Sequence, residues 1–210
     1  EVPIMDDARA LCAEKGVEAS EVLVAGYSIE NALLETTQRL HCDLIIMGWK
    51  GYTTHRERLL GKSMDRVLRG SDVDTLVLKR TGHDPIRRIL LATAGGPHAI
   101  RAALYARKLA TFLNGRVMVI RILPSNASDA DMDHANEELE NLHRTLEGVE
   151  AGHRVLRSDE VVSAIVEAGR EHDAIILGSV GNRRKALFGN IPVQVAQQSD
   201  KTVLVVKTSQ

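Results

Sequence analysis

A glycine-rich stretch beginning at residue 48, GWKGYTTHRERLLGKS, follows directly after the apolar run DLIIM. Gly48, Gly51 and Gly61 have no Cβ, so a phosphate or a ribose can approach their backbone N–H groups closely. Lys62 adds a positive charge and Ser63 a hydroxyl donor, where a helix is expected to begin and to attract anions. The spacing therefore favours a phosphate-binding loop. The alternative is that the glycines only allow the chain to turn and that the lysine is solvated.

The same pattern occurs a second time in the chain. Three blocks recur in the same order, 128 to 132 positions apart: NALLE as SAIVE, DLIIMGWKG as DAIILGSVG, and SDVDTLVLK as SDKTVLVVK. Three matching blocks in one order indicate a tandem duplication. In the second copy the corresponding loop contributes Gly178, Gly181, Gly189 and Asn190 as candidate binding residues.

The second copy alternates short aliphatic runs with patterns of helical periodicity, which is typical of a parallel sheet covered on both faces. Strands are predicted at 87–93, 116–123, 153–158, 173–178 and 202–207, and helices at 97–114, 129–148, 160–172 and 191–198.

The first copy begins later in this order. Its predicted elements are a helix at 3–16, a strand at 20–26, a helix at 29–41 and a strand at 43–48. We therefore expect an α/β protein of two tandem doubly wound, Rossmann-like domains, 1–80 and 87–210, joined by a linker at 81–86. The first domain lacks its first two strands, which we expect to be supplied by sequence ahead of residue 1 or by another chain.

The glycine spacing of the first copy, G-x2-G-x9-G followed by a nearby hydroxyl, resembles the nucleotide-binding motif of the universal stress protein family. LLGKSMDRVLRGSDVDTLVLK also resembles the last helix and strand of that family. The resemblance implies a five-stranded parallel sheet of order 3-2-1-4-5 and binding of ATP, AMP or another adenine nucleotide. It also implies that the last strands, TLVLK and TVLVVK, pair with one another, in a homodimer or in a pseudo-dimer within the chain.

Both copies depart from the family's binding pattern. In the first, Lys62 follows Gly61, so that the hydroxyl of Ser63 comes one position late; in the second, the x9 spacing is shortened to x7. The family's adenine-contacting aspartate, at the end of the first strand, is replaced by Ala94. Thr93, Gly95 and Gly96 still offer polar groups there, so the second site is either adapted to another anion or lost.

Two aromatic or basic features beside the loops have alternative interpretations. Trp49, the single tryptophan, either stacks on a ligand or covers an interface. Basic residues cluster beside both loops and either clamp a polyphosphate or are solvated. They are His55, Arg56, Arg58 and Lys62 in the first copy and Arg183, Arg184 and Lys185 in the second.

Composition excludes several classes of function. A net charge of −1 and an aromatic content of 3% argue against nucleic-acid binding. Two cysteines are too few for a disulfide framework, and they fit a cytoplasmic location. The sequence also shows no spacing typical of metal ligands and no motif of a catalytic nucleophile. We therefore expect a protein that is not an enzyme and holds no metal.

The sequence thus predicts a regulatory or sensory module that binds an adenine nucleotide or a related anion without chemistry. The alternatives are an interaction scaffold with decayed sites, and a slow ATP hydrolase. A further resemblance, to the cytoplasmic tail of some prokaryotic amino-acid permeases, implies that the module regulates a membrane transporter of the same protein.

Overall fold

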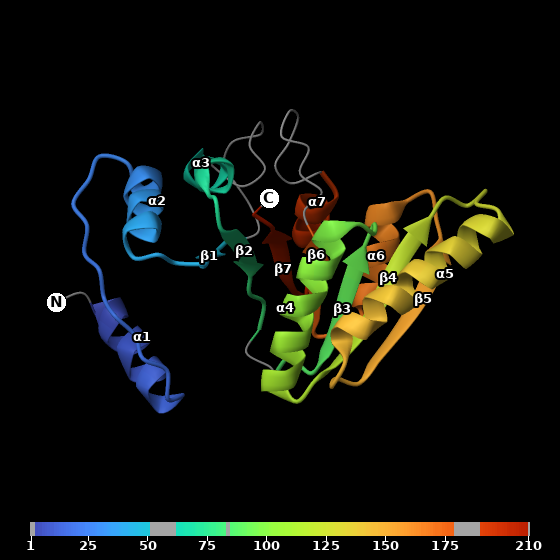
Figure 1. The fold of residues 1–210 in the computed structure, drawn as a ribbon, viewed down its shortest axis with the longest axis horizontal. Helices are drawn as coiled ribbons and strands as arrows, with labels where there is room; N and C mark the ends of the chain where they lie inside the picture. Colours follow the sequence, from blue (N-terminus) through green and yellow to red (C-terminus); the bar gives the residue numbers. More distant parts are fainter. Residues whose placement is uncertain (1–2, 51–61, 83–84, 179–189, 210) are drawn as a thin grey trace.

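The computed structural model describes residues 3–50, 62–82, 85–178 and 190–209 (Figure 1). Its elements, in chain order, are α1 (Pro3–Glu14), α2 (Ile29–Arg39), β1 (Leu44–Gly48), α3 (Lys62–Gly70), β2 (Asp74–Lys79), β3 (Arg88–Thr93), α4 (Pro97–Leu113), β4 (Arg116–Leu123), α5 (Asp129–His143), the 3-10 turn η1 (Arg144–Leu146), β5 (Ala151–Arg157), α6 (Val161–Gly169), β6 (Ala174–Gly178), α7 (Asn190–Gln198) and β7 (Thr202–Lys207).

One seven-stranded sheet runs through the molecule in the order β1-β2-β7-β6-β3-β4-β5. Neighbouring strands are parallel except β2 and β7, which are antiparallel. Within the second half, residues 87–210, the order β5-β4-β3-β6-β7 is the expected 3-2-1-4-5. The doubly wound α/β prediction is therefore confirmed.

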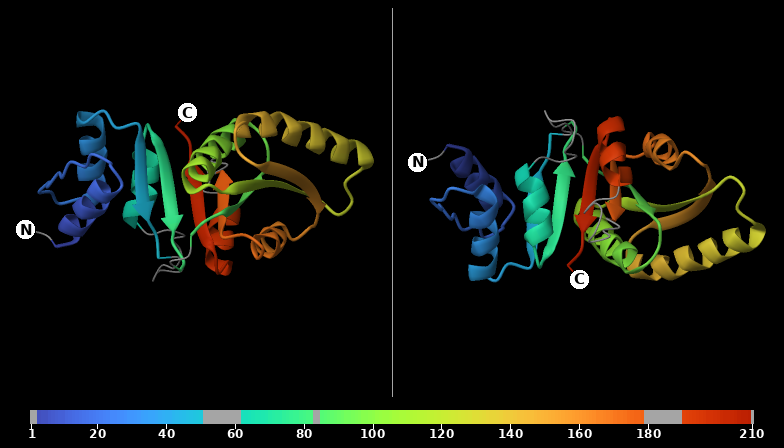
Figure 2. Two further views of the ribbon diagram at one scale, coloured as in Figure 1. Left: turned by 90° about the horizontal axis from the view of Figure 1, so that it is seen from below. Right: turned by 90° about the horizontal axis from the view of Figure 1, so that it is seen from above.

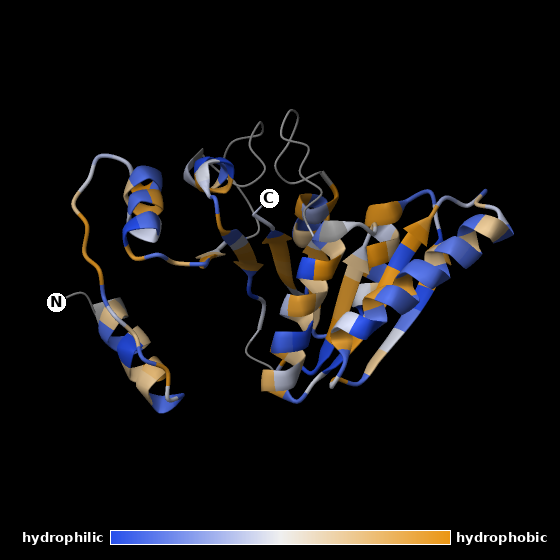
Figure 3. Ribbon diagram, viewed as in Figure 1, coloured by the Kyte–Doolittle hydropathy of each residue, from blue (hydrophilic) through white to orange (hydrophobic). Residues whose placement is uncertain are grey.

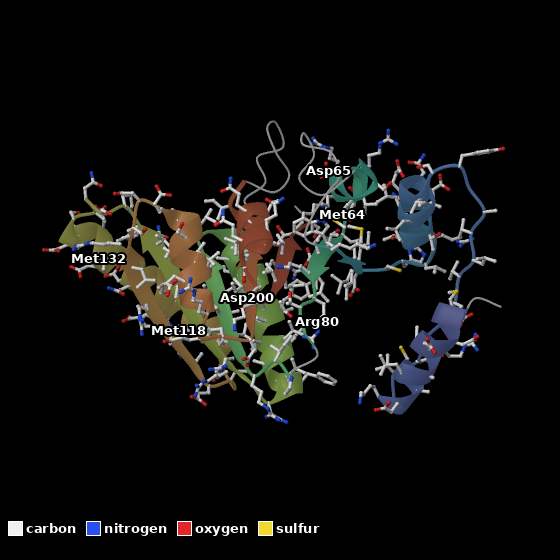
Figure 4. All side chains as sticks on the ribbon, turned by 180° about the vertical axis from the view of Figure 1, so that it is seen from behind. Met64, Asp65, Arg80, Met118, Met132 and Asp200 are labelled. Atoms are coloured by element: carbon white, nitrogen blue, oxygen red, sulfur yellow. The ribbon has the colours of Figure 1, made fainter. Side chains whose placement is uncertain are left out.

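The second half is covered on both faces because its strands are apolar on both sides (Figure 2). On one face, small residues let α4 approach the sheet closely: Ala99, Ala102, Ala103, Ala106 and Ala110. On the other face, α6 and α7 cover a cluster that continues into the first half. Met64 of α3 and Met118 of β4 pack against this same cluster (Figure 4).

Among the described residues of the first half, 1–80, the strands in the sheet are β1 and β2. The prediction of a strand at 20–26 is wrong, because these residues are exposed and unpaired in the structure. The physical reason is that a strand needs a neighbour. The neighbour expected by comparison with the second half, a counterpart of β4, is not among the described residues. The described part of the first half thus has two of the five strands.

The two halves meet through their last strands, as predicted. Val77 of β2 faces Val205 of β7, and these two residues are equivalents in the repeat, 128 positions apart. A pair of equivalent residues facing each other marks a pseudo-twofold axis, so that each half contributes the same surface. The pseudo-dimer prediction is confirmed within the chain.

The pseudo-twofold axis also relates two lysines at this interface. Lys79 Nζ donates to the Ser199 carbonyl, and Lys207 Nζ donates to the Ser71 carbonyl at 2.5 Å. Burial lowers the pKa of Lys79. Beside this pair, Arg80 Nη1 donates to Thr202 Oγ1 at 3.5 Å, which places Arg80 at the junction (Figure 4). Side chains of each half therefore bond the backbone of the other.

We predict that Lys79→Met lowers the free energy of unfolding by about 1–2 kcal/mol, because a charge-assisted hydrogen bond between the halves is lost. Lys207→Met should have a similar effect, and denaturant unfolding measures both. Lys15→Met is the matched control, since the Lys15 side chain is exposed and bonds only the neighbouring Glu14 carboxylate in the described structure. Equal midpoints for all three variants would contradict the prediction.

Candidate functional site

The carboxyl ends of two adjacent parallel strands lie at the centre of the second half. β3 ends at Thr93 and β6 ends at Gly178, and the two strands pair directly. From this point the chain leaves β3 toward α4 on one face and leaves β6 toward α7 on the other. Such a switch point forms the ligand-binding crevice of open parallel sheets. The structure thus brings Thr93, Gly95, Gly96 and Gly178 to one edge.

The connection from β3 to α4 has a conformation that exposes its backbone. Gly95 and Gly96 have φ values of +88° and +79°, which side-chain-bearing residues rarely adopt. Thr93 Oγ1 accepts a hydrogen bond from the Gly95 amide at 2.9 Å and holds the turn in place. Gly96 is the N-cap of α4 and provides no side-chain cap. Pro97 has no N–H and the Ala99 amide donates to the Gly96 carbonyl at 3.1 Å, so the His98 amide is the first-turn donor left for an external acceptor among the described residues.

Gly178 is needed for a close approach between β6 and α4. A Cβ at this position would lie 3.2 Å from the carbonyl oxygen of His98, in the first turn of α4. The His98 ring is held by a hydrogen bond, since its Nδ1 lies 2.5 Å from Thr208 Oγ1. The start of α4 is therefore fixed between the ends of β6 and β7.

We predict that Gly178→Ala lowers the free energy of unfolding by about 1 kcal/mol, because the added methyl group presses on α4 backbone. The equivalent substitution in the first half, Gly48→Ala, is a matched control, since a Cβ at Gly48 meets no described atom within 4 Å. Thermal unfolding of the two variants should separate them, with Gly48→Ala at or slightly above the parent. A larger loss for Gly48→Ala would refute this account of the two glycines.

A pocket of about 210 Å³ opens beside the Gly95–Gly96 turn. Its lining residues include Thr93, Ile100, Asn141 and Thr145, together with the ion pair of Arg121 and Glu138. A Cβ at Gly95 would lie 3.4 Å from Arg121 Nη1 and 3.5 Å from Glu138 Oε1, so the ion pair lies directly over this glycine. The pocket is therefore lined by the backbone of the Gly95–Gly96 turn and by two charged side chains, Arg121 and Glu138, which pair with each other.

Arg121 and Glu138 are not among the residues predicted from the sequence. A signal for Arg121 was present, since an arginine near the carboxyl end of the apolar strand RVMVIRIL is expected at the ligand edge of the sheet. Ala94, at the position of the family's aspartate, is exposed and offers no side-chain acceptor. The acidic group at this edge is instead Glu138, which comes from α5.

The corresponding edge of the first half is incomplete in the described structure. Gly48 ends β1, and α3 begins at Lys62 and continues with the exposed Ser63. No described strand pairs with β1 on the side opposite β2, so the counterpart of the Thr93–Gly96 turn is missing there. Trp49, directly after Gly48, is buried in the cluster between the halves, which confirms its interface role.

Several predicted residues lie outside the described part of the chain. They are Gly51, Gly61, Gly181, Gly189 and the basic residues His55, Arg56, Arg58, Arg183, Arg184 and Lys185. Asn190 is the first residue of α7, as expected from its position after the loop.

A larger cavity lies elsewhere. It has a volume of about 600 Å³ and lies near the amino ends of β3, β4 and β5, lined by residues that include Arg88, Arg116 and Arg154. Parallel sheets bind ligands at the opposite edge, so we assign the site to the smaller pocket.

No group of three or more His, Cys, Asp or Glu side chains in the described part of the chain is placed to hold a metal ion. Among the same residues, no helix combines the length and the apolar composition needed to cross a bilayer.

Solved structures share this fold. A universal stress protein from Archaeoglobus fulgidus DSM 4304 is 21% identical, with a TM-score of 0.70 over 99% of this chain and 76% of that chain. Another, from Archaeoglobus fulgidus in complex with dAMP, is 25% identical, with a TM-score of 0.51 over 59% of this chain and all of that one.

A similar segment forms part of a much longer relative. The Na(+)/H(+) antiporter NhaS5 of Synechocystis sp. is 23% identical over 98% of this chain, which spans only 29% of that protein. The family model of the universal stress proteins matches residues 4–79 and again residues 85–207. Because the two matches cover nearly the whole sequence in tandem, this chain belongs to the universal stress protein family.

Proposed function

We propose that this chain is a non-catalytic regulatory module that binds an adenine nucleotide or a related anion at the carboxyl edge of its second half. The observation that carries the proposal is the Gly95–Gly96 turn at the amino terminus of α4, which lies between the ends of β3 and β6 and leaves the His98 amide without a described acceptor. The similar Archaeoglobus protein in complex with dAMP supports this class of ligand. Of the described residues, Thr93, Gly95, Gly96 and Gly178 would line the site.

The proposal that the module is not an enzyme rests on the charges at the pocket. Of the residues that line it, only Arg121 and Glu138 are charged, and they pair with each other. A carboxylate that is paired with arginine is a poor general base, because the ion pair favours its charged form. These residues would bind and orient a ligand rather than move a proton.

We propose that the module is part of a transporter polypeptide and lies on the cytoplasmic side of the membrane. The support is the antiporter relative, of which a chain like this one forms 29%. Ligand binding at the second half would then bias transport by its differential affinity for two states of the whole protein. Association of two such polypeptides into a homodimer remains a prediction.

A second candidate function, an interaction scaffold with decayed sites, is favoured by one contrast. The β2–β7 interface is fully formed, with its reciprocal lysine bonds, whereas the ligand edge has lost the aspartate at Ala94 and has a shortened loop. A scaffold would keep the interface and bind no nucleotide.

Calorimetric titration with AMP, dAMP, ATP and inorganic phosphate separates the two functions. The regulatory module should bind at least one adenine nucleotide, and Gly96→Ala should weaken that binding about tenfold by moving the turn amides. Gly148→Ala is the matched control: Gly148 has a similar φ of +87°, and both glycines are open to a Cβ among described atoms. Silence with all four ligands, or equal loss in both variants, would favour the scaffold.

A further inference from the structure

The cavity of about 600 Å³ near the amino ends of β3, β4 and β5 lies on the face of the sheet that α6 and α7 cover. On the opposite face α5 packs against β4 and β5, whereas on this face α6 packs against β3 and β4. The cavity therefore lies over the strands beside the carboxyl end of α6. Its volume is within the range of small-molecule sites, about 300–1000 Å³.

The floor of this cavity is apolar. Leu90 of β3 and Ile120 of β4 are buried, and Met118 of β4 and Leu156 of β5 are partly buried against the same cluster. β3 and β4 are hydrophobic along most of their length (Figure 3). A methionine in such a floor adapts its shape to an occupant, because its side chain is unbranched and flexible. The floor would therefore accept an alkyl chain.

Gly152, in the interior of β5, adds space to the cavity. Side chains alternate along a strand, so Gly152 faces the cavity together with Arg154 and Leu156. A Cβ at Gly152 would lie 3.3 Å from the terminal methyl group of Met118, and its φ lies outside the left-handed region. The backbone conformation therefore does not require glycine here. A glycine inside a strand often marks a place where a ligand approaches the backbone closely.

Three arginines line the cavity and differ in their partners: Arg88, Arg116 and Arg154. Arg88 Nη2 donates to Asp173 at 2.9 Å. Arg116 Nη1 lies 3.7 Å from Glu150 Oε1, and the two side chains are 59% and 78% exposed, so that this pair contributes little. Arg154 is exposed and has no hydrogen-bond or ion-pair partner among the described residues.

The remaining titratable groups at the cavity do not neutralise Arg154. Glu171 is exposed and interacts with Arg88, whose pKa it helps to raise. Burial lowers the pKa of His172, so its ring adds no charge at pH 7. The cavity thus combines an apolar floor with one unpaired arginine, Arg154, and one loosely paired arginine, Arg116.

We propose that this cavity binds a small straight-chain alkyl carboxylate. Leu90, Met118 and Gly152 lie side by side across three strands and form the row on which the alkyl chain would lie. Arg154 follows Gly152 by two residues on the same face, at the rim, where its guanidinium would donate two parallel bonds to the carboxylate. This site is distinct from the pocket at the Gly95–Gly96 turn and does not depend on nucleotide binding there.

Methyl NMR tests the proposal, with sodium octanoate as the probe. Octanoate, titrated into the millimolar range, should shift the Met118 methyl resonance and leave the methyl of Met132, on α5, in place (Figure 4). 1-Octanol has the same chain without the charge and should bind at least about tenfold more weakly. An unshifted Met118 methyl, or equal binding of octanol and octanoate, overturns the proposal.

Two substitutions assign the binding to this cavity. Arg154→Gln should weaken octanoate binding about tenfold, because a charge-assisted bond is lost, and Gly152→Leu should abolish binding by filling the space. Arg157→Gln is the matched control, since Arg157 lies in the same strand but bonds Asp129 of α5 at 3.1 Å on the other face. Equal affinities of Arg154→Gln and Arg157→Gln overturn the proposal.

Thermal unfolding shows whether each variant is folded. Arg154→Gln keeps the proposal testable even where Gly152→Leu fails to fold, because Arg154 is exposed. Light scattering covers another occupant, a second copy of the chain. A 210-residue chain that dimerises, and whose dimer Gly152→Leu dissociates, also overturns the proposal, because the cavity would then be an interface between copies.

Discussion

Asp74→Ala is expected to lower the free energy of unfolding by about 3 kcal/mol, because it removes a buried carboxylate that joins the two halves. Asp74 begins β2, and its side chain is fully buried. It accepts hydrogen bonds from Arg101 at 2.5 Å and Tyr105 at 2.8 Å, both on α4. It also accepts bonds from the amide and hydroxyl of Ser209, at 2.8 and 3.0 Å.

These bonds set the ionisation of the group. Burial by itself would raise the pKa of Asp74, but the bonds from Ser209, Tyr105 and Arg101 outweigh it and lower the pKa. Burial and the nearby carboxylate raise the pKa of Tyr105 to about 12, so the phenol remains a donor at neutral pH.

Urea unfolding measures this effect, with Asp72→Ala as the matched control, since Asp72 is exposed two residues earlier. Asp74→Asn should fall between the parent and the alanine variant, because it keeps the shape but loses the charge. If Asp74→Ala and Asp72→Ala have the same midpoint, the network does not join the halves.

Asp173→Asn should lower the free energy of unfolding by about 2 kcal/mol at pH 7. Asp173 precedes β6 and accepts hydrogen bonds from the amides of Arg87 and Arg88, at 3.0 and 2.8 Å, and from Arg88 Nη2 at 2.9 Å. Burial would raise its pKa, but these bonds lower it to about 2. The carboxylate thereby ties the start of β3 to the start of β6.

The pH dependence follows from the direction of this shift. Because the folded pKa lies below the unfolded value of about 3.9, ionised Asp173 stabilises the fold above pH ~4. The contribution is lost as the pH falls from about 4 to about 2. The difference between parent and Asp173→Asn should therefore be largest at pH 7 and small at pH 2.5. A difference independent of pH would show that the charge is not its source, and the exposed Asp133→Asn should change little at any pH.

The second half could be predicted closely from its sequence, because each of its strands and helices carries a local pattern. The strand prediction 116–123 matches β4 residue for residue, since the run RVMVIRIL is bounded by Gly115 and Pro124. The strand order came from the family resemblance, not from the pattern. The periodicity of apolar residues predicts that a strand forms, but it does not predict which strand lies beside it.

The stretch 20–26 shows where local pattern is not sufficient. SEVLVAG has the composition of a strand, but pairing is a non-local interaction, and the expected neighbour is not in the described chain. The same limit applies to polar networks. Asp74 bonds residues 27, 31 and 135 positions away, so that no spacing in the sequence indicates them.

The backbone turn of the candidate site could be predicted from the sequence, but the charged side chains that line its pocket could not. Thr93, Gly95 and Gly96 could be named because the family resemblance places a binding turn after the first strand, at the stretch TAGGP. Arg121 and Glu138 meet only because α5 packs beside β4, and that packing depends on the completed sheet.

The most direct measurement of the central claim is the perturbation of backbone amide resonances by AMP, titrated to millimolar concentration. Binding at the carboxyl edge of the second half should shift the amides of Gly95, Gly96 and Gly178 most strongly, and Gly96→Ala should reduce those shifts. Shifts confined to Arg116 and Arg154 at the opposite edge, or no shifts at all, would contradict the proposed site.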